Sequence, residues 1–140
     1  MNDIEIKIVD HAEEESILRL YRDAGWWKPE YDRAFLKSIP DSSFCFAGAL
    51  LGSGMIGMGR ALSDGVSDAY IQDVTVLKEY RGMGIGTKIV MELIRHLKEH
   101  GVDWIGLIAE PGSAGFYERL GFSPMSAYVP MLLKGKINLE

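Results

Sequence analysis

The sequence predicts an α/β fold: a mixed, mostly antiparallel sheet of six to seven strands with helices on both faces. Three observations predict it. Several short segments alternate apolar and other residues with a period of two, which is typical of strands. Residues 84–100 place their apolar side chains on one stripe at helical spacing. Between residues 69 and 109, a strand, a glycine-rich loop, a helix and an apolar run follow one another, which predicts a βαβ unit.

The composition favours a single domain over residues 1–140. Hydrophobic residues make up 47% and charged residues 25% of the chain, which excludes disorder and coiled-coil composition. The net charge of −5 disfavours nucleic acid and anionic membranes as partners. The single cysteine, Cys45, cannot form an intramolecular disulfide, and no secretory signal or membrane-length apolar run is visible. We therefore expect a cytoplasmic protein.

The first half of the chain predicts a strand, two helices and a hairpin. Residues 4–9 alternate as a strand, and residues 12–24 have helical spacing behind three glutamates, with an end at Gly25. Residues 29–38 predict a second short helix with Pro29 near its first turn. Strands are expected at residues 43–50 and 55–61, joined by a turn at residues 52–54.

The second half predicts strands and helices in alternation. A turn at residues 63–65 leads into a strand at residues 69–76, and the helix at 84–100 ends at Gly101. Residues 102–109 have the length and apolar character of a buried strand. A short helix at residues 115–120 and a last strand at residues 127–133 complete the prediction.

The loop Arg81-Gly82-Met83-Gly84-Ile85-Gly86-Thr87 joins a predicted strand to the long helix. Its glycines allow a tight turn, and the first helical turn offers unpaired N–H groups and the positive end of the helix dipole. A phosphate or pyrophosphate is the expected ligand. A dinucleotide motif would need glycine at Thr87 or Ile89, and a Walker loop has a different spacing, so both fail. The alternative is that the glycines only allow close packing of helix and strand.

Two segments resemble the GCN5-related N-acetyltransferase (GNAT) superfamily. Arg81-x-x-Gly84-x-Gly86, after residues 73–80, resembles its acyl-CoA signature, and residues 115–122, Gly-Phe-Tyr-Glu-Arg-Leu-Gly-Phe, resemble its late FYEKLGF-type motif. With the early helix pair and the meander, the resemblance covers nearly the whole chain. It implies a V-shaped sheet that splays open between the strands at 69–76 and 102–109, with acetyl-CoA in the split.

The resemblance also implies which residues bind this cosubstrate. A bulge in the strand at 69–76 would turn backbone groups of Val74, Thr75 and Val76 toward the pantetheine arm. Lys78, Arg81 and Lys88 are candidates for the adenosine 3′-phosphate, with a solvated surface as the alternative for each. The pyrophosphate would be held by the main chain of Gly82, Met83, Gly84, Ile85, Gly86 and Thr87.

The chemistry implied by the resemblance is direct transfer of an acetyl group to a primary amine of a small molecule. Tyr117 matches the tyrosine that serves as general acid in many relatives, or is a core aromatic. Asp73 and Glu110 are candidates for the general base, with a chain of waters as the alternative. A backbone N–H near Val76 would hold the oxyanion. A protein N-terminal or lysine acetyltransferase and a noncatalytic acyl-CoA sensor remain as alternative functions.

Trp26, Trp27 and Tyr31 fall in the helix-pair region that lines the acceptor side in relatives. They are expected to contact the amine, or else to form a lid or a homodimer contact. One departure concerns Glu110 and Ser113, which stand where many relatives have Asn and Ala in an N-x-x-A-x-x-F-Y pattern. The usual asparagine contact to the cofactor is therefore in doubt.

No metal is expected, because the two histidines spaced four residues apart, His96 and His100, have no third ligand and are expected to face solvent. Cys45 alternates with two phenylalanines in a predicted strand, which favours a buried structural thiol over a nucleophile. The mechanism is therefore expected to proceed without an acyl-enzyme.

Overall fold

The computed structural model describes residues 3–135. The chain divides into two compact units, Met1–Leu107 and Ile108–Glu140. In the described part of the chain, no helix has both the length and the apolar character needed to cross a membrane.

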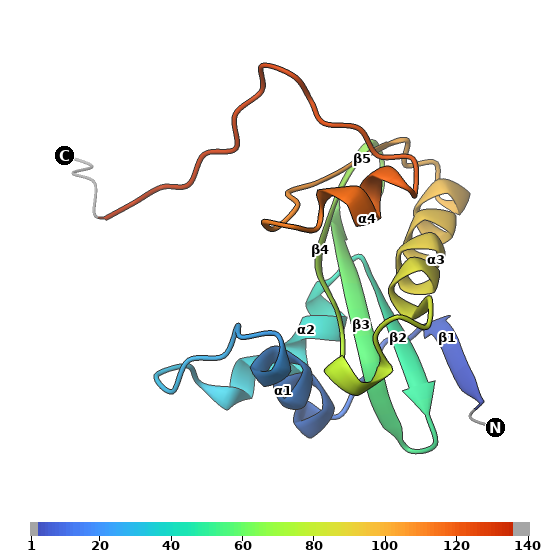
Figure 1. Cartoon of the computed structure of the whole chain (residues 1–140), viewed down its shortest axis with the longest axis vertical. Helices are drawn as coiled ribbons and strands as arrows, with labels where there is room; N and C mark the ends of the chain where they lie inside the picture. Colours follow the sequence, from blue (N-terminus) through green and yellow to red (C-terminus); the bar gives the residue numbers. More distant parts are fainter. Residues whose placement is uncertain (1–2, 136–140) are drawn as a thin grey trace. The chain divides into compact units, whose positions relative to one another are not determined.

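The first unit contains a five-stranded sheet whose strands lie in the order in which they occur in the sequence (Figure 1). Neighbouring strands are antiparallel except β4 and β5, which are parallel. The mixed, mostly antiparallel α/β sheet is therefore confirmed, whereas the expected count of six to seven strands is wrong for residues 3–135. The strands are β1 (Ile4–Ile8), β2 (Cys45–Leu51), β3 (Gly54–Ser63), β4 (Asp68–Val76) and β5 (Trp104–Leu107).

The helices α1 (Glu14–Asp23) and α3 (Ile85–Glu99) lie on either side of this sheet (Figure 1). Along β3, Gly57 and Gly59 face α3, because a Cβ atom on either would lie within 3.0 Å of the Ile89 side chain. Neighbouring residues of a strand point to opposite faces, so Arg60 points to the α1 side. The missing side chains of the two glycines let α3 pack closely on the centre of the sheet, which buries the apolar stripe predicted for this helix.

The second predicted helix is replaced by two short helices. Residues 29–32 form a loop, and a 3₁₀ helix, η1 (Arg33–Ser38), is followed by α2 (Ile39–Ser42). The Asp32 carboxylate accepts a hydrogen bond from the Ala34 N–H at 2.9 Å, so the helical segment starts after Asp32 and not at Pro29. Pro40 instead occupies the first turn of α2.

The second unit contains α4 (Ala114–Glu118) and no strand within residues 108–135. The strand predicted at 127–133 does not form. Ala127 has a φ of 69°, Pro130 has no N–H to donate, and Met131 is 90% exposed. A pattern of apolar residues specifies a strand only where a neighbouring strand completes its hydrogen bonds, and no described strand pairs with this segment.

Candidate functional site

Strand β4 contains a bulge at Asp73 and Val74. Arg60 of β3 pairs with Gln72, and Met58 pairs with Thr75, so the single residue between them on β3 opposes two on β4. Asp73 has a φ of 57°, a left-handed conformation that residues other than glycine rarely adopt. The bulge therefore lies in the strand where the resemblance implies one.

The same strand loses its β5 partner just before the bulge. The parallel pairing of β4 and β5 ends at Ile71 and Leu107, although β4 continues to Val76. Over residues 72–76, this edge of β4 faces no strand in the described part of the chain. The sheet thus opens between the two strands predicted to splay apart, and Val74, Thr75 and Val76 lie at the opening.

The Asp73 carboxylate is held by two donors. Its Oδ2 accepts hydrogen bonds from Arg60 Nε at 2.9 Å and from the Tyr21 hydroxyl at 2.8 Å. Burial, followed by the negative charge of Asp73, raises the pKa of Tyr21 far above its ordinary value, so this hydroxyl stays protonated and donates. The role of Asp73 as a general base stays a prediction, and the structure shows this carboxylate in an ion pair.

Sequence reasoning missed Arg60 and Tyr21. Tyr21 belongs to the apolar stripe of α1 and is 7% exposed, so the helical spacing indicates a core residue and gives no sign of a hydrogen bond to Asp73. Arg60 is the only charged residue in the strand predicted at residues 55–61. A lone charge in an apolar strand was the available signal, because such a group needs a buried partner.

The glycine-rich loop presents free backbone donors. It follows the 3₁₀ helix η2 (Lys78–Tyr80), and Gly82 and Gly84 have φ values of 80° and 79°. The N–H groups of residues 82–87 donate to no atom of the described residues, and the helical pattern starts with Lys88 N–H donating to the Gly84 carbonyl at 3.2 Å. A Cβ at Gly82 or Gly84 would meet nothing within 4 Å, so space for a ligand lies over the loop.

The basic residues around this loop have different roles. Arg81 Nε donates to the Val76 carbonyl at 2.9 Å, so this side chain ties the loop to the end of β4. The Lys78 N–H donates to Asp23 Oδ2 at 2.7 Å, while its side chain is exposed, as is that of Lys88. Contacts of Lys78, Arg81 and Lys88 with an adenosine 3′-phosphate stay predictions.

The three aromatic residues predicted for the acceptor side come together in the first unit. Trp27 stacks on Phe35 with ring centroids 6.0 Å apart and meets Tyr31 edge-on at 5.4 Å, while Trp26 meets Tyr21 edge-on at 5.5 Å. Phe35 also lies 6.5 Å from the Tyr21 ring and thereby joins the two pairs. We call Tyr21, Trp26, Trp27, Tyr31 and Phe35 the aromatic cluster. Tyr21 and Phe35 were not predicted for it.

The remaining predicted residues, Tyr117 and Glu110, belong to the second unit. The Tyr117 ring packs edge-on against Phe116 at 4.9 Å and Phe122 at 5.9 Å. Burial, and after it the negative charge of Glu110, raise the pKa of Tyr117 above its ordinary value. The Glu110 carbonyl accepts hydrogen bonds from the Ser113 N–H at 2.9 Å and its hydroxyl at 2.8 Å, which shapes the turn before α4. The roles of Tyr117 as acid and Glu110 as base stay predictions.

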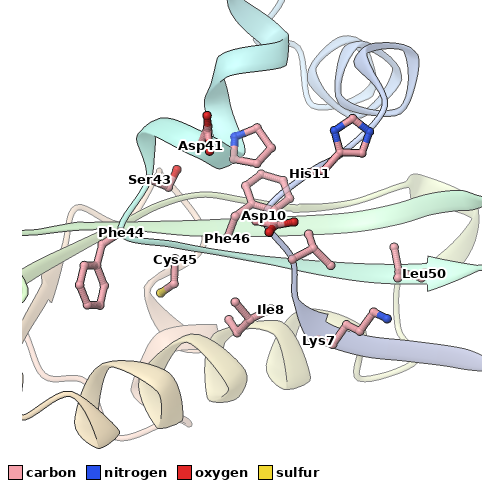
Figure 2. A pocket seen from close by; sticks show the side chains of 12 residues that line it. Lys7, Ile8, Asp10, His11, Asp41, Ser43, Phe44, Cys45, Phe46 and Leu50 are labelled. Atoms are coloured by element: carbon pink, nitrogen blue, oxygen red, sulfur yellow. The ribbon is translucent and has the colours of Figure 1, made fainter.

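A cavity of about 660 Å³ lies elsewhere in the first unit, between the end of β1, α2 and β2. Figure 2 shows Asp10 beside Phe46 at this cavity, which His11 and Cys45 also line. None of the predicted site residues lines it. Cys45 is 4% exposed and burial raises its pKa to about 11, so it is a neutral thiol at pH 7 and fits the predicted structural role.

His96 of α3 and His100, the C-cap residue of this helix, lie against each other; His100 is exposed, as expected, and His96 is partly buried. Their ring centroids lie 4.4 Å apart, and both rings meet Phe44 edge-on. Burial, more than the neighbouring charge of His100, lowers the pKa of His96. Over residues 3–135, no group of three or more His, Cys, Asp or Glu side chains is placed to hold a metal ion.

Residues 9–122, which include the β4 bulge, the glycine-rich loop and α4, match the model of the Acetyltransferase (GNAT) family. The chain belongs to this family. A GNAT-family acetyltransferase from Streptococcus pneumoniae has a similar structure, with 30% identity, a TM-score of 0.80, and coverage of 99% of this chain and 100% of that one. Membership confirms the resemblance drawn from the two motifs and the acyltransferase class that it implies.

Curated relatives of this GNAT-family chain match over shorter stretches. An uncharacterized N-acetyltransferase ycf52 from Pyropia yezoensis is 37% identical over 70 residues, which are 50% of this chain and 40% of that protein. The chloroplastic serotonin N-acetyltransferase 2 of Oryza sativa is 40% identical over 68 residues, 49% of this chain and 34% of that protein. The chain thus spans less than half the length of these relatives.

Proposed function

We propose that this GNAT-family chain is an N-acetyltransferase that transfers the acetyl group of acetyl-CoA directly to a primary amine of a small molecule. The observation that carries the proposal is the run of six N–H groups, in residues 82–87, that have no partner among the described residues at the start of α3. A helix N-terminus with free amides and a positive dipole end is suited to a pyrophosphate. Gly82 and Gly84 leave the space that the phosphates need.

The open edge of β4 provides a site for the pantetheine arm. This arm contains two amide groups, and an extended peptide-like chain binds an unpaired strand edge through main-chain hydrogen bonds. Residues 74–76 offer such an edge beyond the last β4–β5 pair. The Arg81 side chain joins this edge to the phosphate loop through Val76, so the two halves of the cofactor site are mechanically linked.

The reaction needs three groups. An alkyl amine of pKa about 10.4 is neutral about once in 2,500 at pH 7, so a base must take its proton. The neutral nitrogen attacks the thioester carbonyl carbon, a backbone N–H near Val76 stabilises the oxyanion, and the C–S bond breaks. The CoA thiolate then takes a proton from Tyr117, whose raised pKa keeps it protonated until then. The candidates for accepting the proton of the amine are Glu110, water and Asp73, of which Asp73 is already engaged in an ion pair with Arg60.

The aromatic cluster supports an acceptor that carries an aryl group or a cationic amine. Trp and Tyr rings bind such groups by stacking and by cation–π attraction. Tyr31 and Phe35 are each 39% exposed, so part of the cluster is open to a ligand. The rice relative bears the name of an enzyme for serotonin, an arylalkylamine, which agrees with this assignment.

Calorimetry with CoA, followed by a thiol-release assay with acetyl-CoA and a panel of amines, tests the proposal. The panel contains arylalkylamines, aliphatic diamines, an amino sugar, and peptides with a free N-terminus or lysine. We expect micromolar CoA binding and turnover of a small amine. Turnover of peptides alone would favour the protein acetyltransferase, and CoA binding without turnover of any amine would favour the sensor. A cytoplasmic location and pairing of two chains stay predictions.

A further inference from the structure

We propose that Arg60 and Tyr21 are positioning residues that hold the bulge of β4 in its cofactor-binding conformation through the Asp73 carboxylate. The proposal rests on the proposed function, because it concerns the strand edge that the cofactor would use. It assigns Asp73 to holding the backbone and not to taking a proton from the amine.

The conformation of Asp73 has to be held by its surroundings. A φ of 57° places its backbone in the left-handed region, which residues with a Cβ atom adopt less readily than glycine and which aspartate tolerates better than alanine. Such a conformation persists only where neighbouring structure imposes it. Glycine would adopt this conformation freely, yet the residue is an aspartate. One oxygen of its carboxylate, Oδ2, accepts hydrogen bonds from both Tyr21 and Arg60.

Three separate elements meet at that oxygen. Arg60 comes from β3, where its register partner is Gln72, the residue immediately before the bulge. Tyr21 comes from α1 and is packed against Trp26. Both donors bind Asp73 Oδ2, and the Arg60 and Asp73 side chains are only 16% and 22% exposed. Hydrogen bonds to a carboxylate are stronger than neutral ones, and partial burial reduces their screening by water.

By holding the bulge, the ion pair of Asp73 also determines which main-chain groups residues 74–76 present at the open edge of β4. A bulge adds one residue to a strand, and loss of the bulge would shift the following residues by one position and reverse their facing. The side chain of Val74 now packs over Gly59 on the α3 face, and residues 75 and 76 pair with β3. If the bulge relaxed, the main chain at residues 74–76 would no longer present the same groups to a cofactor.

The test compares two substitutions at one position. Asp73→Ala removes the carboxylate that holds the left-handed backbone but keeps a Cβ atom, so this conformation loses its support and a smaller fraction of molecules is able to bind CoA. We expect the Kd for CoA to rise about tenfold. Asp73→Gly also removes the carboxylate but tolerates the backbone, so its Kd should stay within about threefold of the parent. Acetylation by the Gly variant should retain the parental pH profile.

Arg60 is tested in the same way. Arg60→Met leaves Asp73 with a single donor and should weaken CoA binding by about tenfold. The double variant Arg60→Met with Asp73→Gly contains neither the unpaired charge nor the strained residue, and its Kd should return to within about threefold of the parent. Arg95→Met is the matched control, because Arg95 pairs with Glu92 and Glu99 on the exposed side of α3. It should bind CoA as the parent does.

Each variant is first checked for a cooperative thermal transition. Tyr21→Phe, which keeps the ring packing and loses one donor, supplies a milder variant with an expected Kd increase of about threefold. The inference is overturned if Asp73→Gly binds CoA as weakly as Asp73→Ala, or if all variants bind as the parent. Equal loss of kcat in both Asp73 variants with parental CoA affinity would assign Asp73 as the base and also overturn it. A parent that binds no CoA would instead refute the proposed function.

Discussion

Gly84→Glu is the sharpest test of the phosphate site. Gly84 is the N-cap of α3, and a side chain built there would point into open space beside the free amides. A carboxylate about 5 Å from a bound phosphate, at an effective dielectric constant of about 20, would cost about 3 kcal/mol per phosphate charge. That energy corresponds to a Kd for CoA at least about 100-fold higher. The carboxylate would also compete for the N–H groups that the phosphates need.

Two control variants separate charge from backbone strain. Gly101 also has a left-handed backbone, with a φ of 82°, and its Cβ would likewise meet nothing within 4 Å, but it follows the other end of the 15-residue helix. Gly101→Glu therefore has the same charge change and a similar strain, and its affinity for CoA should match the parent. Gly84→Ala has the strain without the charge, so it should lose about 1 kcal/mol of stability and less than about tenfold in affinity.

Calorimetry with CoA at two salt concentrations provides the measurement. Repulsion between the introduced carboxylate and the phosphates is screened by ions, so the affinity loss of Gly84→Glu should shrink as the salt concentration rises. A folded Gly84→Glu protein that binds CoA within about threefold of the parent would refute a phosphate site at this loop. An equal loss in Gly101→Glu would show that the effect comes from global charge or stability.

Three further predictions follow from the same structure. Tyr117→Phe should lower kcat by about 10²-fold or more and leave the affinity for CoA unchanged. Because the pKa of Tyr117 is raised, the kcat of the parent should stay constant until the pH exceeds the ordinary range of tyrosine. A variant as fast as the parent in the thiol-release assay excludes the acid role. Gly59→Ala should reduce the free energy of unfolding, measured in urea titrations, by about 1–3 kcal/mol, because its Cβ would lie 2.8 Å from Ile89 Cγ2. A variant as stable as the parent would contradict close packing of α3 on the sheet. Trp27→Ala should raise KM about tenfold for an arylalkylamine and little for an aliphatic diamine, and an equal rise for both would argue against aromatic recognition.

Local signals in the sequence explain which parts of the fold were predictable. The helix at 84–100 and the glycine-rich loop were predicted almost to the residue, because helical spacing and glycine conformation depend on neighbours in the chain. The prediction of a strand at 127–133 was wrong, because a strand forms only beside a partner strand and the sequence of one segment does not specify that partner. The bulge itself was expected only from the family resemblance.

The contacts that organise the candidate site are mostly long-range and were therefore missed. Asp73 bonds a tyrosine 52 residues away and an arginine 13 residues away, and no spacing rule connects such positions. Trp26, Trp27 and Tyr31 were grouped because they are close in sequence. Their link to the rest of the site through Tyr21 depends on how α1 packs against the sheet.

Tyr21 is the residue where the two halves of the proposed reaction meet. Its ring belongs to the aromatic cluster proposed for the acceptor amine, and its hydroxyl holds the bulge proposed for the cofactor. A shift of the cluster on amine binding would therefore act on Asp73 through one hydrogen bond 2.8 Å long. By linkage, a cofactor that stabilises the bulge would also stabilise the position of the Tyr21 ring. The two binding events are thus expected to be coupled through Tyr21, and the coupling would be measured as a change in CoA affinity when the amine is present.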